Sequence, residues 1–369
     1  MKAIITGGGT GGHIYPALAI ADELKKKGWE ILYLGSKHRM EAEIVPQKGY
    51  QFQGLTSRQL PRRISWQIFS AFFYNLKAFI NALKINYNFK ADLVIGTGGF
   101  AAGPVVMAAV LLGRKTIIHE QNAYPGITNK LLALFVDYIF LNFSAAEKHL
   151  KAKKAKIKLT GNPVRKEILA AEPEKAYKFL NLDKSLKTLL ITGGSQGAET
   201  INKNLIKIYQ HAAENNEFQI VHLTGKKNYD QVIRSLKEHN IDPDNRLIKV
   251  IAYLNEMEYA LTAADLVISR AGATALSEIT LCAIPSILIP LASAAEGHQL
   301  YNAKTLANKG AAIIIREEEL SEQILLEKIL SLFNDQSKLE KMSQAAKSLA
   351  NENSLEKIIT LIDNIVTKD

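Results

Sequence analysis

The sequence Ile268-Ser-Arg-Ala-Gly-Ala-Thr-Ala-Leu-Ser-Glu278 decides the fold that we expect, because it joins an apolar strand to a helix through small residues. We predict the strand over residues 264–268, a turn around Gly272 and a helix from about Thr274. A helix that begins in such a turn presents free backbone N–H groups at its positive end, which suit an anion such as a diphosphate. Glu278 would lie in the first turns of this helix, where its carboxylate could accept hydrogen bonds from both hydroxyls of a ribose.

A second unit of the same kind follows directly. Residues 285–290 form an apolar run that ends in proline, and a loop of small residues, 291–299, leads into a helix that we expect to begin at Tyr301. One unit of strand, loop and helix is common in α/β proteins, so this region alone indicates little about function.

Three glycine-rich turns elsewhere in the chain also follow predicted strands. They are the first glycine turn, residues 7–12, the second, residues 97–104, and the third, residues 193–197. The predicted strands are residues 2–6, 30–34, 92–96, 116–122, 137–142, 188–192, 218–223, 247–251, 264–268 and 285–290. Alternating strands and helices indicate a parallel sheet covered on both faces. We therefore predict the α/β class, with two doubly wound, Rossmann-like domains facing across a cleft and ligands bound at the strand C-termini.

Length and a linker-like stretch predict where the two domains divide. A chain of 369 residues is long enough for two domains of ordinary size. Gly161-Asn-Pro-Val164 has the character of a linker, so we expect an N-terminal domain over 1–162 and a C-terminal domain over 163–349. A helix over about 350–369 is a candidate to pack back on the N-terminal domain. Cys282 is the single cysteine, which excludes a disulfide framework and a thiolate metal cluster.

Charge is distributed unevenly along the chain. Residues 1–162 hold 22 Lys and Arg against 9 Asp and Glu, a balance of +13, whereas residues 163–369 hold 24 against 27. Such asymmetry suggests that the first half meets something anionic, either nucleic acid or an anionic membrane surface. Residues 93–113 carry no charge, but their glycines and proline favour a strand, a turn and a buried helix over a membrane span.

Residues 64–80 are rich in aromatic side chains and follow Arg62 and Arg63. A helix here would place the apolar residues 69, 72, 73, 76, 79, 80 and 83 on one face. That face is either part of the buried core or a surface that contacts a membrane, and the pattern alone leaves both interpretations open.

The sequence contains little evidence for a metal-binding site or a dinucleotide-binding site. The first glycine turn matches the pattern Gly7-x-Gly9-x-x-Gly12, but the next strand ends in Gly35-Ser36, without the acidic residue that would bind an adenosine ribose. Asp242-Pro-Asp244 is the only Asp-x-Asp pair and is typical of a turn. The eight histidines include no i,i+4 ligand pair, and no glycine turn ends in Gly-Lys-Ser/Thr. We expect neither a metal nor a cofactor.

Six segments taken together carry a resemblance to a known family. They are Gly8-Gly-Thr-Gly-Gly-His13, Gly96-Thr-Gly-Gly99, His119-Glu-Gln-Asn122, Gly161-Asn-Pro-Val-Arg165, Gly193-Gly-Ser-Gln-Gly-Ala198 and residues 269–278. In this order they closely resemble the MurG family of bacterial UDP-N-acetylglucosamine–N-acetylmuramyl-(pentapeptide) pyrophosphoryl-undecaprenol N-acetylglucosaminyltransferases. The resemblance extends from Ile5 to about Ala312 and implies the two-domain glycosyltransferase B fold.

The resemblance also implies an activity. Enzymes of this family transfer N-acetylglucosamine from UDP-N-acetylglucosamine to the C4 hydroxyl of muramic acid in lipid I, which gives lipid II with inversion at the anomeric carbon, in peptidoglycan synthesis. The implied partners are UDP-N-acetylglucosamine, the undecaprenyl-linked acceptor lipid I and an anionic membrane surface, with other cell-wall synthesis proteins as candidates and no nucleic acid. The implied location is peripheral, on the cytoplasmic face of the bacterial cell membrane.

Carried over residue by residue, the resemblance implies a set of substrate-binding residues. They are Thr10, Gly11, Gly12, Asn122, Arg165, Ser195, Leu254, Ala273, Thr274, Ala275, Leu276, Ser277, Glu278 and Gln299. By this resemblance the Leu254 backbone binds the uracil edge and Tyr253 covers its ring. Ser195 and the helix start near Thr274 bind the diphosphate. Glu278 binds the ribose, and Gln299 with Asn122 binds the sugar, with His298 as the alternative to Gln299.

His13 is the candidate catalytic base. It directly follows the first glycine turn, and an imidazole titrates in the range suited to taking the proton that an attacking hydroxyl loses. By the resemblance, His13 and the second glycine turn line the acceptor side. The leaving UDP develops negative charge, which a helix N-terminus and Arg165 could stabilise without a metal.

Three other functions compete with this interpretation. The nearest is a UDP-sugar epimerase or another nucleotide-sugar transferase of the same fold. A nucleic-acid-binding protein would use the basic first half, but the chain shows no recognition-helix motif, zinc finger or RNA-binding aromatic signature. A Rossmann oxidoreductase is disfavoured by the missing ribose carboxylate.

Overall fold

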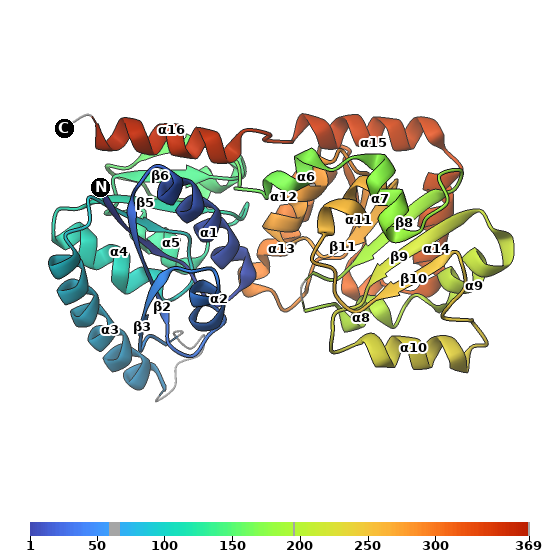
Figure 1. Cartoon of the computed structure of the whole chain (residues 1–369), viewed down its shortest axis with the longest axis horizontal. Coiled ribbons are helices and arrows are strands. Elements are labelled where there is room, and N and C mark those ends of the chain that lie inside the picture. Colours follow the sequence, from blue (N-terminus) through green and yellow to red (C-terminus); the bar gives the residue numbers. More distant parts are fainter. Residues whose placement is uncertain (59–66, 195, 368–369) are drawn as a thin grey trace. The chain divides into compact units, whose positions relative to one another are not determined.

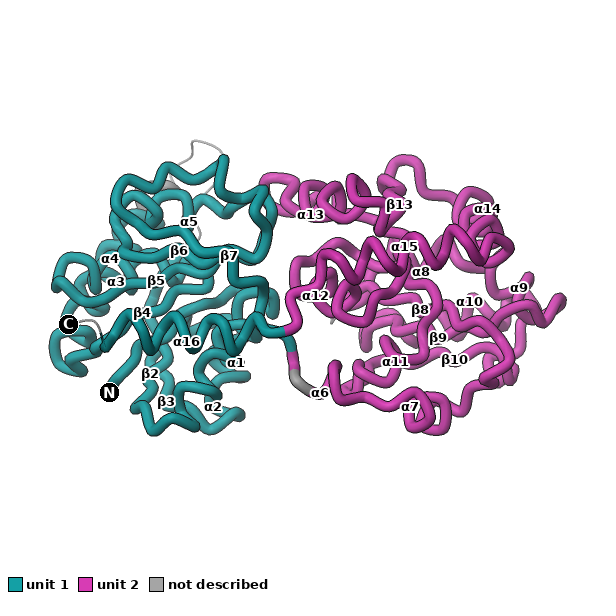
Figure 2. The backbone as a smooth tube through the Cα atoms, turned by 90° about the horizontal axis from the view of Figure 1, so that it is seen from above, with its two compact units in different colours: residues 1–164, 353–369 teal, residues 165–352 magenta. Residues whose placement is uncertain are grey.

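The computed structural model describes residues 1–58, 67–194 and 196–367, and for residues 67–70 and 166 it describes the backbone alone. The chain divides into two compact units, which Figure 2 distinguishes by colour. Unit 1 comprises residues 1–164 and 353–369, and unit 2 comprises residues 165–352.

Unit 1 is built on one parallel sheet of seven strands. The strands are β1 (Lys2–Thr6), β2 (Glu30–Ser36), β3 (Gln51–Leu55), β4 (Leu93–Gly96), β5 (Lys115–Glu120), β6 (Tyr138–Leu141) and β7 (Lys156–Leu159). Their spatial order is β3-β2-β1-β4-β5-β6-β7, so the direction of winding reverses between β1 and β4. Thr6 and Gly96 are register partners at the C-terminal ends of these two strands. Open parallel sheets bind ligands at such a switch point, and here the first and second glycine turns follow it.

Helices cover both faces of this sheet. They are α1 (Gly11–Lys26), α2 (Glu41–Gln47), α3 (Gln67–Phe89), α4 (Ala102–Leu111), α5 (Ile127–Leu132), the 3-10 helix η1 (Ser144–His149) and α16 (Ser354–Val366). One face is covered by α1, α2 and α16, and the other by α3, α4 and α5. The last helix in the sequence, α16, thus packs against α1 in unit 1 (Figure 1). There the Nζ atom of Lys27 lies 2.5 Å from the Oδ2 atom of Asp363.

The start of α1 differs from our expectation. The sequence predicts a helix from about Tyr15 to Lys27, after the first glycine turn and His13. Instead α1 begins at Gly11, and the carbonyl of Thr10 accepts hydrogen bonds from the backbone N–H groups of His13 and Ile14, at 3.1 and 3.2 Å. His13 therefore lies in the first turn of the helix.

The uncharged stretch of residues 93–113 forms β4, a glycine turn and the buried helix α4, as predicted. Within residues 1–58, 67–194 and 196–367, no helix is long and apolar enough to cross a membrane.

The helix α3 buries several small side chains and leaves four large aliphatic or phenylalanine side chains exposed. The buried side chains include Ala71, Ala78 and Ala82. The large exposed apolar side chains are Phe72, Phe73, Leu76 and Ile80, which are 59%, 66%, 42% and 57% exposed. The core interpretation is therefore wrong for these four positions. Alanine lets α3 approach α4 closely, and Phe79 and Leu83 are partly buried against the same core, so the core interpretation holds at these two positions.

Unit 2 repeats the plan with a parallel sheet of six strands. The strands are β8 (Lys187–Thr192), β9 (Phe218–Leu223), β10 (Ile248–Ile251), β11 (Leu266–Ser269), β12 (Ser286–Leu288) and β13 (Ala312–Ile314). The order β10-β9-β8-β11-β12-β13 places the switch point between β8 and β11, where Thr192 and Ser269 are register partners. The third glycine turn follows β8, and the turn at Gly272 follows β11.

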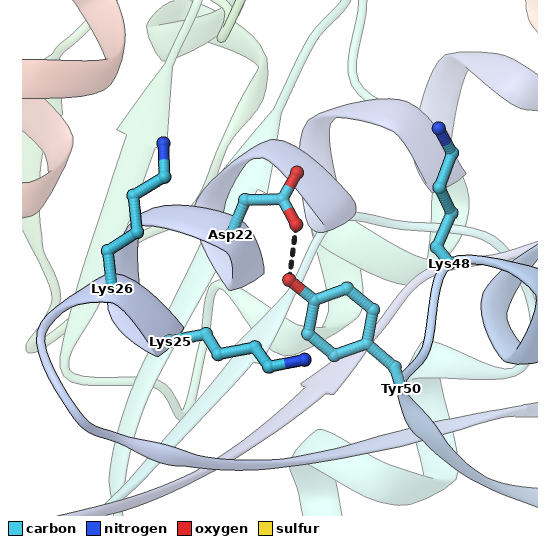
Figure 3. A pocket seen from close by; sticks show the side chains of 5 residues that line it. All are labelled: Asp22, Lys25, Lys26, Lys48 and Tyr50. Atoms are coloured by element: carbon cyan, nitrogen blue, oxygen red, sulfur yellow. Dashed lines mark hydrogen bonds between the residues drawn. The ribbon is translucent and has the colours of Figure 1, made fainter.

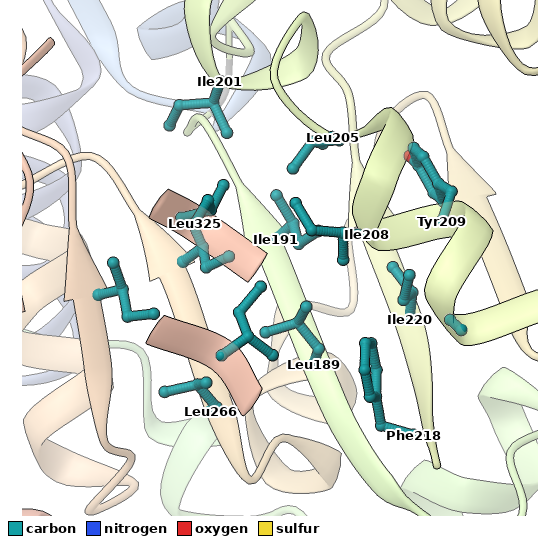
Figure 4. Close-up of a cluster of buried hydrophobic side chains, with 14 of the residues drawn as sticks. Leu189, Ile191, Ile201, Leu205, Ile208, Tyr209, Phe218, Ile220, Leu266 and Leu325 are labelled. Carbon is teal, nitrogen blue, oxygen red and sulfur yellow. The ribbon is translucent and has the colours of Figure 1, made fainter. Parts of the chain in front are cut away.

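The helices of unit 2 surround this sheet. They are α6 (Lys166–Ala170), α7 (Pro173–Leu180), α8 (Glu199–Asn202), α9 (Ile206–Asn215), α10 (Tyr229–Glu238), α11 (Met257–Ala263), α12 (Ala273–Leu281), η2 (Ala295–Gly297), α13 (His298–Ala307), η3 (Glu317–Glu319), α14 (Glu322–Phe333) and α15 (Gln336–Ser348). On one face Leu189 and Ile191 of β8 pack with side chains of α9 and α14, including Ile208 and Leu325 (Figure 4). Apolar burial of this kind is the main driving force for such a core.

The helix α13 begins at His298, three residues before the expected Tyr301. Gly297, with φ +64°, turns the chain into the helix, and this left-handed backbone is readily adopted by glycine. Taken together, the two sheets confirm the predicted α/β class with two doubly wound, Rossmann-like domains.

Candidate functional site

The first and second glycine turns meet at the switch point of unit 1. The backbone N–H of Gly8 donates to the carbonyl of Gly98 at 3.3 Å. Gly99 has φ +82°, and a Cβ atom at this position would overlap the Gly8 carbonyl. The two backbones can approach this closely only because neither turn carries a side chain at the contact.

Glu41 holds the first glycine turn in place by hydrogen bonds, a role that the sequence did not predict. This buried carboxylate accepts from the N–H of Gly9 through Oε2 and from the N–H of Ser36 through Oε1, each at 3.0 Å. It thereby ties the turn after β1 to the end of β2. Two hydrogen bonds to the charged form stabilise a buried carboxylate against its desolvation.

His13 projects from the first turn of α1 toward the second glycine turn. Its Nδ1 atom lies 2.8 Å from the carbonyl oxygen of Thr97 and 3.1 Å from Oε1 of Gln121. The Thr97 hydroxyl in turn donates to the His13 carbonyl at 2.8 Å. Thr10 is the N-cap residue of α1, and Gly11 and Gly12 are its first two residues. Unit 1 thus brings His13, Thr10, Gly11 and Gly12 together.

Asn122 follows β5 and is oriented by Glu120. The Oε1 atom of this buried carboxylate accepts from the backbone and side-chain N–H groups of Asn122, at 2.9 and 3.2 Å. Its Oε2 atom accepts from Nδ2 of Asn129 at 2.8 Å. We expected β5 to continue to Asn122, but the strand ends at Glu120 and the asparagine lies in the loop.

In unit 2 the third glycine turn packs against residues 224–225. Gly197 has φ +73°, and a Cβ atom there would overlap the carbonyl of Thr224. Beneath this contact the side chain of Asn202 donates to the same Thr224 carbonyl at 3.1 Å and pairs with Nε2 of the buried His222 at 3.0 Å. Ser195, the predicted diphosphate ligand of this turn, lies outside the described residues.

The helix α12 presents the N-terminus that the sequence predicts. Its N-cap is Gly272, and within the described part of the chain no side chain caps this end. Orphan N–H groups at a helix start make an anion site. Ala273 and Leu276 are buried, so they offer backbone groups, while Thr274, Ala275 and Ser277 are partly exposed. Ser277 donates its hydroxyl proton to the carbonyl of Ala273 at 2.9 Å.

Glu278 lies on the same helix, with its side chain 13% exposed. The Nε atom of Arg165 lies 3.6 Å from its Oε1 atom, and Nη1 of Arg165 donates to the carbonyl of Asn255 at 3.1 Å. Burial raises the pKa of Glu278 to about 7, and the arginine opposes this shift. Unit 2 thus brings Arg165, Glu278 and the loop after β10 together, and that loop also carries Leu254.

Tyr253 in this loop is 40% exposed, and the Nζ atom of Lys226 lies 5.2 Å from the centre of its ring. An exposed aromatic face beside the backbone of Leu254 is suited to stacking on a planar base. The position of Tyr253 is therefore consistent with the role that the resemblance implies.

Gln299 and His298, at the start of α13, each form a hydrogen bond with the backbone of the preceding loop, but with different residues. Oε1 of Gln299 accepts from the N–H of Leu291 at 3.0 Å, which folds this side chain back on its own loop. His298 donates from Nδ1 to the carbonyl of Ala295 at 2.6 Å. The amide nitrogen of Gln299 is not used in the bond to Leu291, so this residue keeps a donor for a sugar hydroxyl.

Arg270 is a further residue that the sequence analysis missed. This buried guanidinium donates to the Ile289 carbonyl at 3.1 Å, and its Nη2 atom lies 2.6 Å from Oε1 of Glu317. The other oxygen of Glu317 accepts from the N–H of Ala292 at 2.8 Å. The pair therefore fixes the loop that leads to Gln299. The signal that could have found it is an arginine directly after a buried strand, where a charge needs a partner.

A surface pocket elsewhere in unit 1 contains none of the predicted site residues. It has a volume of about 400 Å³ and is lined by Asp22, Lys25, Lys26, Lys48 and Tyr50 (Figure 3). Three of its residues come from the C-terminal half of α1, whereas the first glycine turn lies at the N-terminal end of this helix. Lysines at a helix C-terminus complement the helix dipole, which accounts for this cluster. Among the described residues, no group of three or more His, Cys, Asp or Glu side chains could bind a metal ion.

Comparisons with known proteins agree along the whole chain. The Glycosyltransferase family 28 N-terminal domain matches residues 3–141, and the Glycosyltransferase family 28 C-terminal domain matches residues 188–361. A UDP-N-acetylglucosamine–N-acetylmuramyl-(pentapeptide) pyrophosphoryl-undecaprenol N-acetylglucosamine transferase of Halothermothrix orenii is 48% identical over 366 residues, 99% of each chain. One of the same name from Desulfitobacterium hafniense is 43% identical over 363 residues, 98% of each chain.

A solved structure extends this similarity to three dimensions. The crystal structure of Acinetobacter baumannii MurG has a TM-score of 0.78 and 27% identity, and the match covers 98% of this chain and 99% of that one. The chain therefore belongs to the MurG family of glycosyltransferases, the UDP-N-acetylglucosamine–N-acetylmuramyl-(pentapeptide) pyrophosphoryl-undecaprenol N-acetylglucosamine transferases.

Proposed function

We propose that this protein transfers N-acetylglucosamine from UDP-N-acetylglucosamine to the C4 hydroxyl of the undecaprenyl-pyrophosphoryl-N-acetylmuramoyl-pentapeptide, lipid I, and so forms lipid II. The observation that carries this proposal is the 48% identity over 99% of both chains to a relative named for that reaction. Two features support the proposal, namely a helix start without a side-chain cap at the switch point of unit 2, which suits an anion, and a histidine at a glycine turn in unit 1.

The donor is assigned mainly to unit 2. The N-terminus of α12, from Ala273 to Ser277, and Ser195 bind the diphosphate, and Glu278 accepts hydrogen bonds from the ribose hydroxyls. In this assignment Arg165, 3.6 Å from Glu278, also lies close enough to help stabilise the charge on the leaving UDP. Leu254 binds the uracil edge, and Gln299 binds the sugar.

The acceptor is assigned to unit 1. His13 removes the proton of the C4 hydroxyl as its oxygen attacks the anomeric carbon, and UDP leaves with the electron pair of the glycosidic bond. Attack from the face opposite the leaving group inverts the anomeric centre. Thr10, Gly11, Gly12 and Asn122 contribute N–H groups and an amide for the transferred sugar.

A product assay tests this function. The protein is incubated with sugar-labelled UDP-N-acetylglucosamine, with and without lipid I in detergent. We expect a labelled, β-linked lipid disaccharide together with one UDP per transfer, and no reaction of the donor alone. Conversion of the donor to an epimer in the absence of acceptor would contradict the proposal and identify an epimerase of the same fold.

A membrane surface is the second proposed partner, because the acceptor carries a lipid. The helix α3 contains no Asp or Glu, exposes Phe72, Phe73, Leu76 and Ile80, and also exposes Lys77 and Lys84. Inserted aromatic side chains contribute apolar burial, and each basic residue near an anionic leaflet contributes about 1 kcal/mol. Of the residues first considered for this role, Arg62, Arg63 and Trp66 lie outside the described residues, as does the side chain of Phe69. This surface favours a peripheral location on the cytoplasmic face of the cell membrane.

Co-sedimentation with liposomes tests the membrane surface. Binding should increase with the fraction of anionic lipid, decrease with salt, and fall strongly for the double variant Phe72→Ser, Phe73→Ser. The matched control is Leu169→Ser, Ile324→Ser, which removes exposed apolar side chains from unit 2 and should bind like the wild type. If both double variants bind equally well, α3 is not the contact surface.

A further inference from the structure

We propose that Gln121 and His119 are positioning residues that act with the Thr97 carbonyl to orient His13 and to hold it in the tautomer whose Nε2 atom can accept a proton. This inference deepens the proposed transfer reaction and rests on it. Neither residue touches a substrate in the assignment above, and both act through His13.

The chain of hydrogen bonds begins at a backbone carbonyl, which fixes its direction. The oxygen of Gly161 lies 2.9 Å from Nε2 of His119. A carbonyl oxygen can only accept, so Nε2 of His119 carries the hydrogen. In a neutral imidazole the other nitrogen, Nδ1, is then an acceptor, and Nε2 of Gln121 donates to it at 3.0 Å.

The orientation of the Gln121 amide follows from this first step. Its Nε2 atom also donates to the backbone carbonyl of His119 at 3.2 Å. If the amide group of Gln121 were flipped, its oxygen would face two acceptors, Nδ1 and the backbone carbonyl of His119. Oε1 must therefore be the atom that faces His13. The two atoms near Nδ1 of His13 are then both acceptors, the Thr97 carbonyl at 2.8 Å and Oε1 of Gln121 at 3.1 Å.

His13 must therefore carry its hydrogen on Nδ1, which leaves the lone pair of the neutral ring on Nε2. When the acceptor O–H bond breaks, its proton goes to this Nε2 atom, while the oxygen forms the new glycosidic bond. The imidazolium that results is stabilised by the same two acceptors, because hydrogen bonds from a charged donor are stronger than neutral ones. A partner that sets the tautomer and stabilises the imidazolium is the arrangement found in histidine-based catalytic triads.

The hydrogen bonds that run from Gly161 through His119 and Gln121 to His13 are called the relay below. Burial makes the relay rigid and keeps His119 neutral. The side chains of His119 and Gln121 are 0% and 1% exposed. Burial lowers the pKa of His119 to about 4, so this ring stays neutral at physiological pH and keeps an acceptor for Gln121. Gln121 is neutral at any pH, so the direction of the hydrogen bonds does not change as long as His119 is neutral, well above pH 4.

Nitrogen NMR of protein labelled with ¹⁵N at histidine reads the tautomer directly. The signal of His13 is assigned by its loss in His13→Ala. We expect a protonated Nδ1 and an unprotonated Nε2 in the wild type. In Gln121→Met and in His119→Phe the Thr97 carbonyl still accepts from Nδ1, so we expect this tautomer to persist with a shifted Nδ1 signal, because one of the two acceptors is lost or misplaced. A wild-type His13 with its hydrogen on Nε2, or variants with an unchanged His13 signal, would overturn the proposal.

Kinetics separate positioning from a purely structural role. Gln121→Met should lower kcat about 10–100-fold, the usual cost of removing the partner that orients a functional histidine, with KM for the donor within about twofold of wild type. In a His13→Ala background the same change should have no further effect, because there is no ring left to orient. An equal loss in both backgrounds would show that Gln121 supports the fold and not His13.

Thr116→Val is the matched control, because it removes a buried hydroxyl at the opposite end of the same strand, β5. It should leave both kcat and the His13 signal unchanged, and a shift of that signal in this control would count against the relay. A failure of the transfer reaction itself would appear as a wild type that makes no lipid disaccharide. The tautomer measurement needs no substrate, so it tests the relay separately.

Discussion

In unit 1 the turn after β1 leads into a helix whose first turn holds His13, whereas in unit 2 the corresponding turn after β8, residues 193–197, contains only Gly, Ser and Gln. Unit 2 instead uses the other strand at its switch point, β11, from which α12 carries Glu278. The same topology therefore provides helix starts on both sides of each switch point. We propose that the side chains that follow decide whether such a start takes part in proton transfer or binds a ligand.

The outer layers differ as well. In unit 1 the exposed surface of α3 is apolar and basic, and residues 1–162 hold 22 Lys and Arg against 9 Asp and Glu. Residues 163–369 hold 24 against 27. A unit that works on a membrane-bound acceptor needs an anion-attracting surface, and a unit that binds a small donor does not. We infer a division of labour, with proton transfer and lipid contact in unit 1 and nucleotide binding in unit 2.

The largest effect that tests this division of labour is expected from replacing His13, which should affect proton transfer and not donor binding. His13→Ala should lower kcat about 10²–10⁴-fold, the usual contribution of a general base, and should leave the donor Kd within about twofold. Single-turnover rates and calorimetric titration with UDP-N-acetylglucosamine measure the two quantities. The control is His38→Ala, an exposed histidine of the same unit. A kcat within about threefold of wild type would remove His13 from the base role.

The two units should lose similar amounts of stability when a glycine in the close contact between turns within each unit is replaced. Gly99→Ala and Gly197→Ala should each cost about 2–5 kcal/mol of stability, because a left-handed backbone and an overlap with a carbonyl add together. Gly28→Ala is the control, since its φ is +81° but its Cβ would meet no described atom within 4 Å; it should cost only about 1–2 kcal/mol. Chemical unfolding measures all three. Equal costs at the three positions would contradict the close packing of the turns.

Glu278 tests the other half of the division. Glu278→Ala should weaken UDP-N-acetylglucosamine binding by about 1–3 kcal/mol, because buried polar groups of the ribose lose their partner. The exposed Glu318→Ala is the control. An unchanged Kd, or wild-type activity that EDTA abolishes, would instead point away from a ribose contact.

The smallest expected effect is on stability as pH changes. The pKa of Glu278 is raised to about 7 in the folded protein from an ordinary value of 4.5, so the folded state binds this proton more tightly than the unfolded state. The resulting stability is fully present below pH 4.5 and is lost as the pH rises through 7. Glu278→Gln stays neutral and should gain about 1–2 kcal/mol over wild type between pH 5 and pH 8, a value reduced because the carboxylate is partly solvated. Thermal unfolding at both pH values measures this gain, and an equal difference at both would show that Glu278 titrates normally.

Much of the fold could be predicted because glycine turns after apolar strands are local signals. The strands β3, β7 and β13 were missed, since each is short or polar and lies at or near a sheet edge. The face of α3 that is buried could not be predicted, because alanine and phenylalanine both count as apolar.

The site was predictable only in part. The role of Gln121 depends on His13, 108 residues away, and that of Arg270 on Glu317, 47 residues away. Pairings over such distances along the chain arise from topology, and no local pattern indicates them. The family resemblance supplied the remaining site residues, which stay predictions until a substrate is bound.

Hydrogen–deuterium exchange with UDP and with UDP-N-acetylglucosamine tests the division of labour most directly. The account predicts that UDP alone slows exchange in unit 2, in residues 272–278 and around Leu254, and leaves residues 7–13 of unit 1 unchanged. Adding the sugar should extend the protection to residues 10–12 and to the peptides that contain Asn122 and Gln299. Protection by UDP of residues 7–13, with none in residues 272–278, would contradict the account.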